Sequence, residues 1–102
     1  MRKIYLINQA GTTLYKIGIT KKAVATRIKE LQVGNANELQ YITEYETKYG
    51  HKLETAMHTH FRTKRINSEW FELNAEEVGA FRILCEKYEG IFRTLKDNPF
   101  FK

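Results

Sequence analysis

The sequence predicts an α+β domain in which a small three-stranded antiparallel sheet is flanked by helices. Three segments, at residues 3–7, 14–19 and 39–46, alternate apolar and other side chains with the period of a strand. Helical periodicity follows the second and the third of these segments. Because sheet and helices must share one apolar interior, we expect a compact two-layer arrangement.

The chain of 102 residues shows no repeat, no low-complexity tract and no linker. This length suits one domain with one modest core. We therefore expect a single domain over 1–102, with its core at about 3–73 and a C-terminal helix and tail at 74–102.

The first two strands are predicted to form a hairpin. Residues 3–7 are rich in β-formers, and Gly11 gives the following stretch turn character. A two-residue turn at Ala10–Gly11 would place Tyr5 directly opposite Lys16. Alternation also gives this hairpin one apolar face and one mixed face. The apolar face carries Ile4, Leu6, Tyr15, Ile17 and Ile19, and the mixed face carries Lys3, Tyr5, Ile7, Leu14, Lys16 and Gly18.

A first helix is expected from about Lys21 to Gln32, with Thr20 as its N-cap and Gly34 just past its end. Its apolar stripe consists of Val24, Ile28 and Leu31. Arg27 lies at helical spacing from Val24, so it falls on the buried side of the helix.

A second helix is expected over about 48–64, after the third strand. Leu53, Met57, His60 and Phe61 share one stripe, and Glu54 borders it. We expect His60 against the core and His58 toward the edge of that stripe. The following residues 68–73 are predicted to form a short extended segment.

A third helix is predicted to begin after Asn74, where Glu77 completes a capping box. Its buried face is expected to contain Val78, Phe81, Cys85 and Tyr88. Helix is expected to continue beyond Gly90, and the ending Asn98–Lys102 to fray or to dock through its two phenylalanines.

The composition restricts the setting and the partners. Cys85 is the only cysteine, so no intramolecular disulfide can form, and a small buried thiol in a reducing cytoplasm is the expected role. No apolar run approaches a membrane span, and the start of the chain is too short in apolar residues for a signal peptide. The net charge of +5 is compatible with a solubilising surface or with an anionic partner such as nucleic acid.

Several short motifs in this order resemble the GIY-YIG nuclease superfamily. Lys3-Ile4-Tyr5 stands where Gly-Ile-Tyr would be, and Lys16-Ile17-Gly18 stands where Tyr-Ile-Gly would be. The wider pattern is similar to the phage-type branch, from about Ile4 to Leu73. In this chain it reads YLI, YKIGIT, R-I-K-E-L-Q-x-G-N, E-x-x-M-H-x-x-F and E-W-F.

The resemblance implies a metal-dependent DNA endonuclease that hydrolyses phosphodiester bonds. It implies Tyr5 as general base, Arg27 on the phosphate and Glu54 as ligand of one Mg²⁺ or Mn²⁺ ion. We expect Lys16 either to lower the pKa of Tyr5 or to contact the phosphate, and we expect that phosphate to approach the bare backbone at Gly18. Further expected substrate-binding residues are Tyr15, Gly18, His58 and Asn67.

Alternatives remain open at this point. A slip of the strand register would make Tyr15 rather than Tyr5 the base. The chain could instead be a catalytically weak nucleic-acid-binding module that keeps the fold, since the Gly and Tyr of the two motifs are replaced by Lys3 and Lys16. A third interpretation is a protein-interaction domain, which would bind with little salt dependence. The sequence fixes neither the oligomeric state nor the target.

Overall fold

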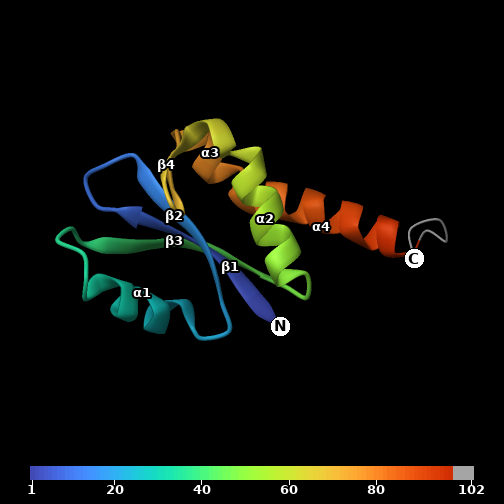
Figure 1. Cartoon of the computed structure of the whole chain (residues 1–102), viewed down its shortest axis with the longest axis horizontal. Coiled ribbons are helices and arrows are strands. Elements are labelled where there is room, and N and C mark those ends of the chain that lie inside the picture. Colours follow the sequence, from blue (N-terminus) through green and yellow to red (C-terminus); the bar gives the residue numbers. More distant parts are fainter. Residues whose placement is uncertain (98–102) are drawn as a thin grey trace.

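The computed structural model describes residues 1–97 and contains an antiparallel sheet with helices on both faces (Figure 1). The strand order is β3-β1-β2-β5-β4. The strands are β1 (Arg2–Gln9), β2 (Leu14–Thr20), β3 (Leu39–Thr47), β4 (Arg65–Asn67) and β5 (Trp70–Glu72). The helices are α1 (Val24–Gln32), α2 (Gly50–His60), α3 (Ala75–Gly79) and α4 (Phe81–Asp97), and a 3₁₀ turn, η1 (Arg62–Lys64), follows α2. In these residues no helix is both long and apolar enough to cross a membrane.

The prediction of a three-stranded sheet is wrong, because the sheet has five strands. The segment expected only to be extended forms strand β5, and β4 precedes it as an edge strand. Leu14 to Lys16 of β2 pair with Glu72 to Trp70 of β5, which satisfies backbone groups that would otherwise be unpaired. Strands of three residues are too short to display a period of two. The α+β class itself fits the structure.

The predicted register of the first hairpin is also wrong. Tyr5 pairs with Gly18, and Lys16 pairs with Ile7. The turn is wider than two residues because the buried Asn8 side chain holds it open, donating to the carbonyls of Thr12 at 3.1 Å and Leu14 at 3.0 Å. The shift is by two residues, so every side chain keeps the sheet face that alternation predicts.

The two faces of the sheet bury two separate apolar clusters. The larger one lies between the sheet and the helices α2 and α4, and includes Ile4, Leu6, Ile17, Leu53, Met57, Phe61, Phe71, Phe81 and Cys85. The smaller one lies under α1 and joins Tyr5 and Ile7 to Val24, Leu39, Ile28 and Leu31. Tyr15 packs against the larger cluster, as its predicted face requires. Tyr5 and Tyr15 therefore belong to opposite faces of the sheet.

The starts of α1 and α2 lie later than expected. Thr20 does not cap α1, which begins at Val24. Its hydroxyl instead accepts a hydrogen bond from the Lys22 amide at 3.0 Å. Only Leu53, Met57 and Phe61, spaced four apart, face the core from α2.

The prediction that His60 packs against the core is wrong, because the residue is exposed. The final turn of α2 points its ring to the helix edge, where it lies 3.0 Å from the Tyr88 hydroxyl.

The C-terminal part divides into two helices where one was expected. The capping box of Asn74 and Glu77 is present at the start of α3. The chain leaves helical geometry at Ala80, and α4 then buries Phe81 and Cys85, as predicted for that face. The distal half of α4 extends away from the sheet (Figure 1). The expectation for Asn98–Lys102 lies outside the described residues.

Candidate active site

The Tyr5 side chain lies across Gly18, its partner on β2. A Cβ atom on Gly18 would come within 2.9 Å of Cε1 of the Tyr5 ring, and closer still to Cζ and the hydroxyl oxygen. Any side chain at position 18 would therefore overlap the phenol. The expectation that a phosphate approaches Gly18 is wrong, because the Tyr5 ring already occupies that space.

Arg27 is the cation that acts on Tyr5. Burial raises the pKa of the Tyr5 phenol above its ordinary value of 10, and the Arg27 guanidinium opposes this through hydrogen bonding and charge. The same contact raises the pKa of Arg27. Arg27 projects from α1, is half-exposed, and also lies 3.3 Å from Glu30. It thus touches the buried phenol while part of its guanidinium reaches solvent.

Lys16 is paired with a carboxylate rather than with Tyr5. Its Nζ lies 2.9 Å from Oε1 of Glu69, and its side chain is only 11% exposed. Nζ also lies 5.9 Å from the centre of the Trp70 ring. The strand pairing that carries β5 along β2 brings Glu69 to this position. The result is a largely buried lysine whose charge is balanced by Glu69.

Glu54 reaches the same region from α2. It is half-buried, and its pKa is raised, first by burial and then by the negative charge of Glu69. Electrostatic interactions with His58, His51 and Lys16 oppose that shift. Glu69 and Glu54 also raise the pKa of Tyr5. Tyr5, Arg27, Lys16, Glu54 and Glu69 therefore lie close enough to affect one another's charge, although they come from different elements.

Glu69 is the member of this cluster that sequence reasoning missed. The Glu-Trp-Phe motif is part of the family resemblance, but the motif by itself indicates no role for Glu69. The signal was a charged residue next to the buried Phe71 strand, on a turn whose tightness follows from Ser68 at φ 42°.

His58 has both ring nitrogens engaged within the protein. Its Nε2 lies 2.8 Å from the carbonyl oxygen of Ile17, so Nε2 carries the proton and donates. Its Nδ1 accepts from the Arg65 guanidinium at 3.0 Å. The ring also meets Phe71 edge-on, with centroids 5.0 Å apart. These contacts fasten α2 to the sheet beside Glu54.

Two other predicted site residues lie apart from the cluster. Tyr15 is on the opposite face of the sheet from Tyr5, within reach of the larger core. Asn67 is exposed on the edge strand β4, where it pairs with Trp70. It is connected to the cluster through the turn that carries Glu69.

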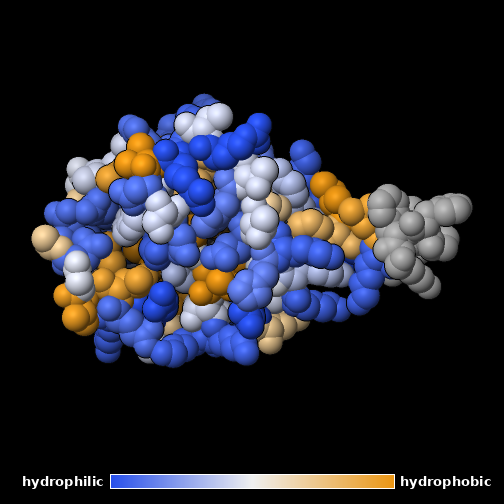
Figure 2. Space-filling model, viewed as in Figure 1, coloured by the Kyte–Doolittle hydropathy of each residue, from blue (hydrophilic) through white to orange (hydrophobic). Residues whose placement is uncertain are grey.

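An open groove of about 330 Å³ adjoins Glu54 on the outer side of α2. Its lining consists of Glu54, Thr55, His58, Thr59, Arg62 and Arg65. In Figure 2 strongly hydrophilic residues gather over the end of α2 and the adjoining β4. The two arginines give this groove the charge that an anionic substrate requires.

The carboxylates in this cluster fit a hard divalent cation that keeps most of its waters. Within residues 1–97 no group of three or more His, Cys, Asp or Glu residues is arranged to enclose a metal. Mg²⁺ and Mn²⁺ do not need such a cage, since one or two carboxylates, water and phosphate oxygens suffice. Glu54, whose charge is disfavoured by burial and by Glu69, is the carboxylate that a nearby cation would stabilise most.

Comparison with known proteins gives one match. The T5orf172 domain family, which is phage-associated and related to nuclease-like folds, matches residues 2–86. No curated protein and no solved structure gives a match. The matched range covers the sheet, α1, α2, α3 and the first turn of α4, and includes the whole charged cluster around Tyr5.

Proposed function

We propose that this chain, which belongs to the T5orf172 domain family, is a metal-dependent DNA endonuclease with the GIY-YIG arrangement of site residues. The observation that carries the proposal is the meeting of Tyr5, Arg27 and Glu54, from β1, α1 and α2, in one charged cluster. A phenol, a guanidinium and a carboxylate are the groups that this hydrolysis needs as base, phosphate clamp and metal ligand.

Tyr5 is the proposed general base. Its hydroxyl lies against the bare backbone of Gly18, which fixes where the oxygen sits. A phenol with a pKa above 10 is ionised in about one molecule in a thousand or fewer at pH 7. Arg27 favours the phenolate, and so enlarges the fraction of enzyme that can accept a proton from the attacking water.

Arg27 is also the proposed phosphate clamp. Its guanidinium is half-exposed, so its free N–H groups can donate to the non-bridging oxygens of a bound phosphodiester. Its current carboxylate partner, Glu30, is shared with Lys22. A phosphate can therefore replace Glu30 at Arg27 without leaving Glu30 unpaired.

Glu54 is the proposed ligand of the divalent cation, and Glu69 adds negative charge nearby. When bound, the cation stabilises charge on the phosphate and on the leaving oxygen. Lys16, which is paired with Glu69 beside the cluster, is proposed to contact the phosphate. This replaces the role of tuning Tyr5, since Lys16 is opposite Ile7 and paired with Glu69.

The proposal is tested by nicking of supercoiled plasmid in Mg²⁺ or Mn²⁺, with EDTA as the metal-free arm. Tyr5→Phe and Glu54→Gln remove the base and the ligand while nearly preserving volume. Tyr41→Phe and Glu86→Gln are matched controls, because both side chains are exposed and lie outside the cluster. Cleavage that survives both site variants at the wild-type rate would refute the assignment.

The second candidate is a DNA-binding module that does not cleave. It is favoured by Lys3 and Lys16, which replace the Gly and Tyr of the two motifs, and by the pairing of Lys16 with Glu69. In that case the wild type would bind duplex DNA with a steep salt dependence, would not nick plasmid in either metal, and would bind equally well in EDTA.

A further inference from the structure

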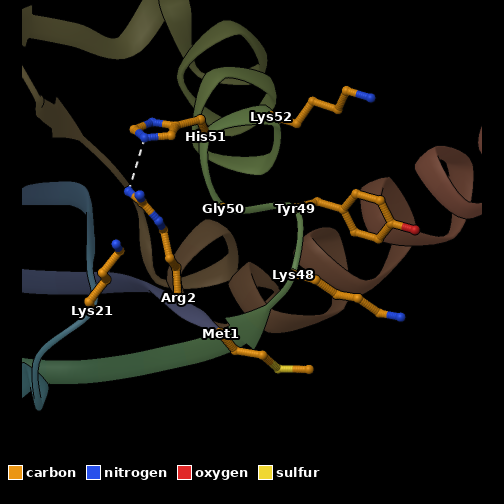
Figure 3. Close-up of a pocket in the computed structure, with 8 residues that line it drawn as sticks. All are labelled: Met1, Arg2, Lys21, Lys48, Tyr49, Gly50, His51 and Lys52. Carbon is orange, nitrogen blue, oxygen red and sulfur yellow. Dashed lines mark hydrogen bonds between the residues drawn. The ribbon is translucent and has the colours of Figure 1, made fainter.

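A second concave surface lies at the N-terminal end of α2, outside the charged cluster around Tyr5 (Figure 3). It is an open pocket of about 860 Å³. The residues that line it are Met1, Arg2, Lys21, Lys48, Tyr49, Gly50, His51 and Lys52. None of them is assigned a role in the proposed reaction.

The lining is cationic and contains no carboxylate. Arg2, Lys21, Lys48 and Lys52 take part in none of the salt bridges formed within residues 1–97. A pocket whose Arg and Lys side chains have no carboxylate among their neighbours in the lining suits an anion.

The polar side chains of the lining divide into two groups. In Figure 3 Arg2, Lys21 and His51 point toward one another, whereas Lys48, Tyr49 and Lys52 lie on the other side of Gly50. The second group is occupied with α4, since Lys52 lies 5.8 Å from the centre of the Phe92 ring and Tyr49 also meets that ring. The Arg2, Lys21 and His51 side of the pocket is therefore the side that faces an incoming ligand.

This side of the pocket is held by close packing. A Cβ atom on Gly50 would lie 2.7 Å from Cδ1 of Ile19 and 2.8 Å from Cδ of Arg2, so the start of α2 packs against the ends of β1 and β2. The Arg2 guanidinium donates to Nε2 of His51 at 3.0 Å. Arg2 keeps further N–H donors for a ligand. The first turn of α2 contains no acidic residue that would compete.

The pocket is continuous with the candidate active site along α2. His51, Glu54 and His58 are spaced three and four residues apart, so they share one face of the helix. His51 also interacts electrostatically with Glu54. Beyond Glu54, at the C-terminal end of α2, lies the groove that Arg62 of η1 and Arg65 of β4 line. Positive surfaces thus flank Glu54 on both sides.

We propose that Arg2, Lys21 and His51 bind a backbone phosphate of the DNA strand next to the phosphodiester that is cleaved. The strand then runs along α2, from this pocket past Glu54 to Arg62 and Arg65. His51 and His58 are seven residues apart, or about 10 Å along the helix axis. This inference rests on the proposed function, because Glu54 is taken as the point of cleavage.

The test measures binding separately from cleavage. The variant Arg2→Gln/Lys21→Gln is compared with Lys87→Gln/Lys96→Gln, which removes the same charge from exposed positions on α4. Affinity for a duplex is measured in EDTA over a range of salt concentrations, with thermal unfolding as the check of folding. The logarithm of the association constant falls linearly with the logarithm of the salt concentration. The pocket variant is expected to make this slope less steep by about 1, and the α4 variant is expected to leave it unchanged.

Three outcomes would overturn the inference: equal slopes for the two variants, a wild type that does not bind duplex DNA, or binding of inorganic phosphate at the pocket with no effect of the variant on DNA. Failure of the proposed function has a different signature. If the wild type binds DNA but does not nick plasmid in Mg²⁺ or Mn²⁺, the proposed endonuclease activity is refuted. A change of salt slope that is confined to the pocket variant would still show that this pocket binds a DNA phosphate.

Discussion

Replacement of Gly18 by alanine should destabilise the protein through one identifiable contact. The new methyl group would overlap the Tyr5 hydroxyl and Cζ, and would lie 2.9 Å from Cε1. The Tyr5 ring is buried, so it cannot swing into solvent without giving up its place in the smaller core. Overpacking of this kind costs about 1–3 kcal/mol in free energy of unfolding.

The same substitution should cost far more in activity. If the phenol is the base, displacing its oxygen by about 1 Å lowers the rate by about a hundredfold. Urea unfolding gives the stability term, and single-turnover cleavage gives the rate. Gly90→Ala is the matched control, because a Cβ there meets nothing within 4 Å. Lying inside α4, Gly90→Ala should stabilise the fold by up to about 1 kcal/mol.

A double variant isolates the contact. In a Tyr5→Leu background the phenol is gone, so adding Gly18→Ala should cost much less than it does in the wild type. If the cost of Gly18→Ala is the same in both backgrounds, the overlap with Tyr5 is not its cause. The interpretation that Gly18 leaves the space occupied by the Tyr5 ring would then be wrong.

Three further predictions concern the charges of the site. The pKa of Tyr5 is raised above 10, and the proposed base is its phenolate form. The cleavage rate should therefore rise about tenfold per pH unit from neutral pH until that pKa is approached. A rate that is flat from pH 7 to 9 would exclude Tyr5 as the base. Arg27→Met should lower the cleavage rate by about two to three powers of ten and move the basic limb of the pH–rate profile to higher pH. If the variant loses stability but not activity, Arg27 is a structural residue. Glu69→Gln should lower the pKa of both Tyr5 and Glu54, because the negative charge of Glu69 raises them. Titration followed by NMR measures both pKa values, and unchanged values would show that Glu69 does not act on the two groups.

Which side chains share a sheet face was predictable because it depends only on the parity of positions along a strand. Tyr5, Lys16 and Gly18 keep their face even though the hairpin register was wrong. The register itself depends on the turn, and the turn is widened by the hydrogen bonds of Asn8 to Thr12 and Leu14. A side chain that reaches back across a loop leaves no periodic signal in the sequence.

The position of Lys16 was predictable only in part. Its place on the mixed face follows from alternation, but its partner depends on strand β5, whose three residues carry no readable period. The predicted hairpin alone, without β5, places Tyr5 nearest to Lys16. With β5 in place, Oε1 of Glu69 lies 2.9 Å from Nζ of Lys16 and forms an ion pair with it.

The most direct test of the central claim is plasmid nicking by wild type and Glu54→Gln under single-turnover conditions in Mn²⁺. Both proteins are first shown to have the same far-UV circular dichroism and the same affinity for duplex DNA in EDTA. We predict nicking by the wild type that EDTA abolishes, and nicking by Glu54→Gln reduced at least a hundredfold at unchanged DNA affinity. Equal nicking by the two proteins, or none by a wild type that binds DNA, would contradict the claim that this site is a metal-dependent nuclease centre.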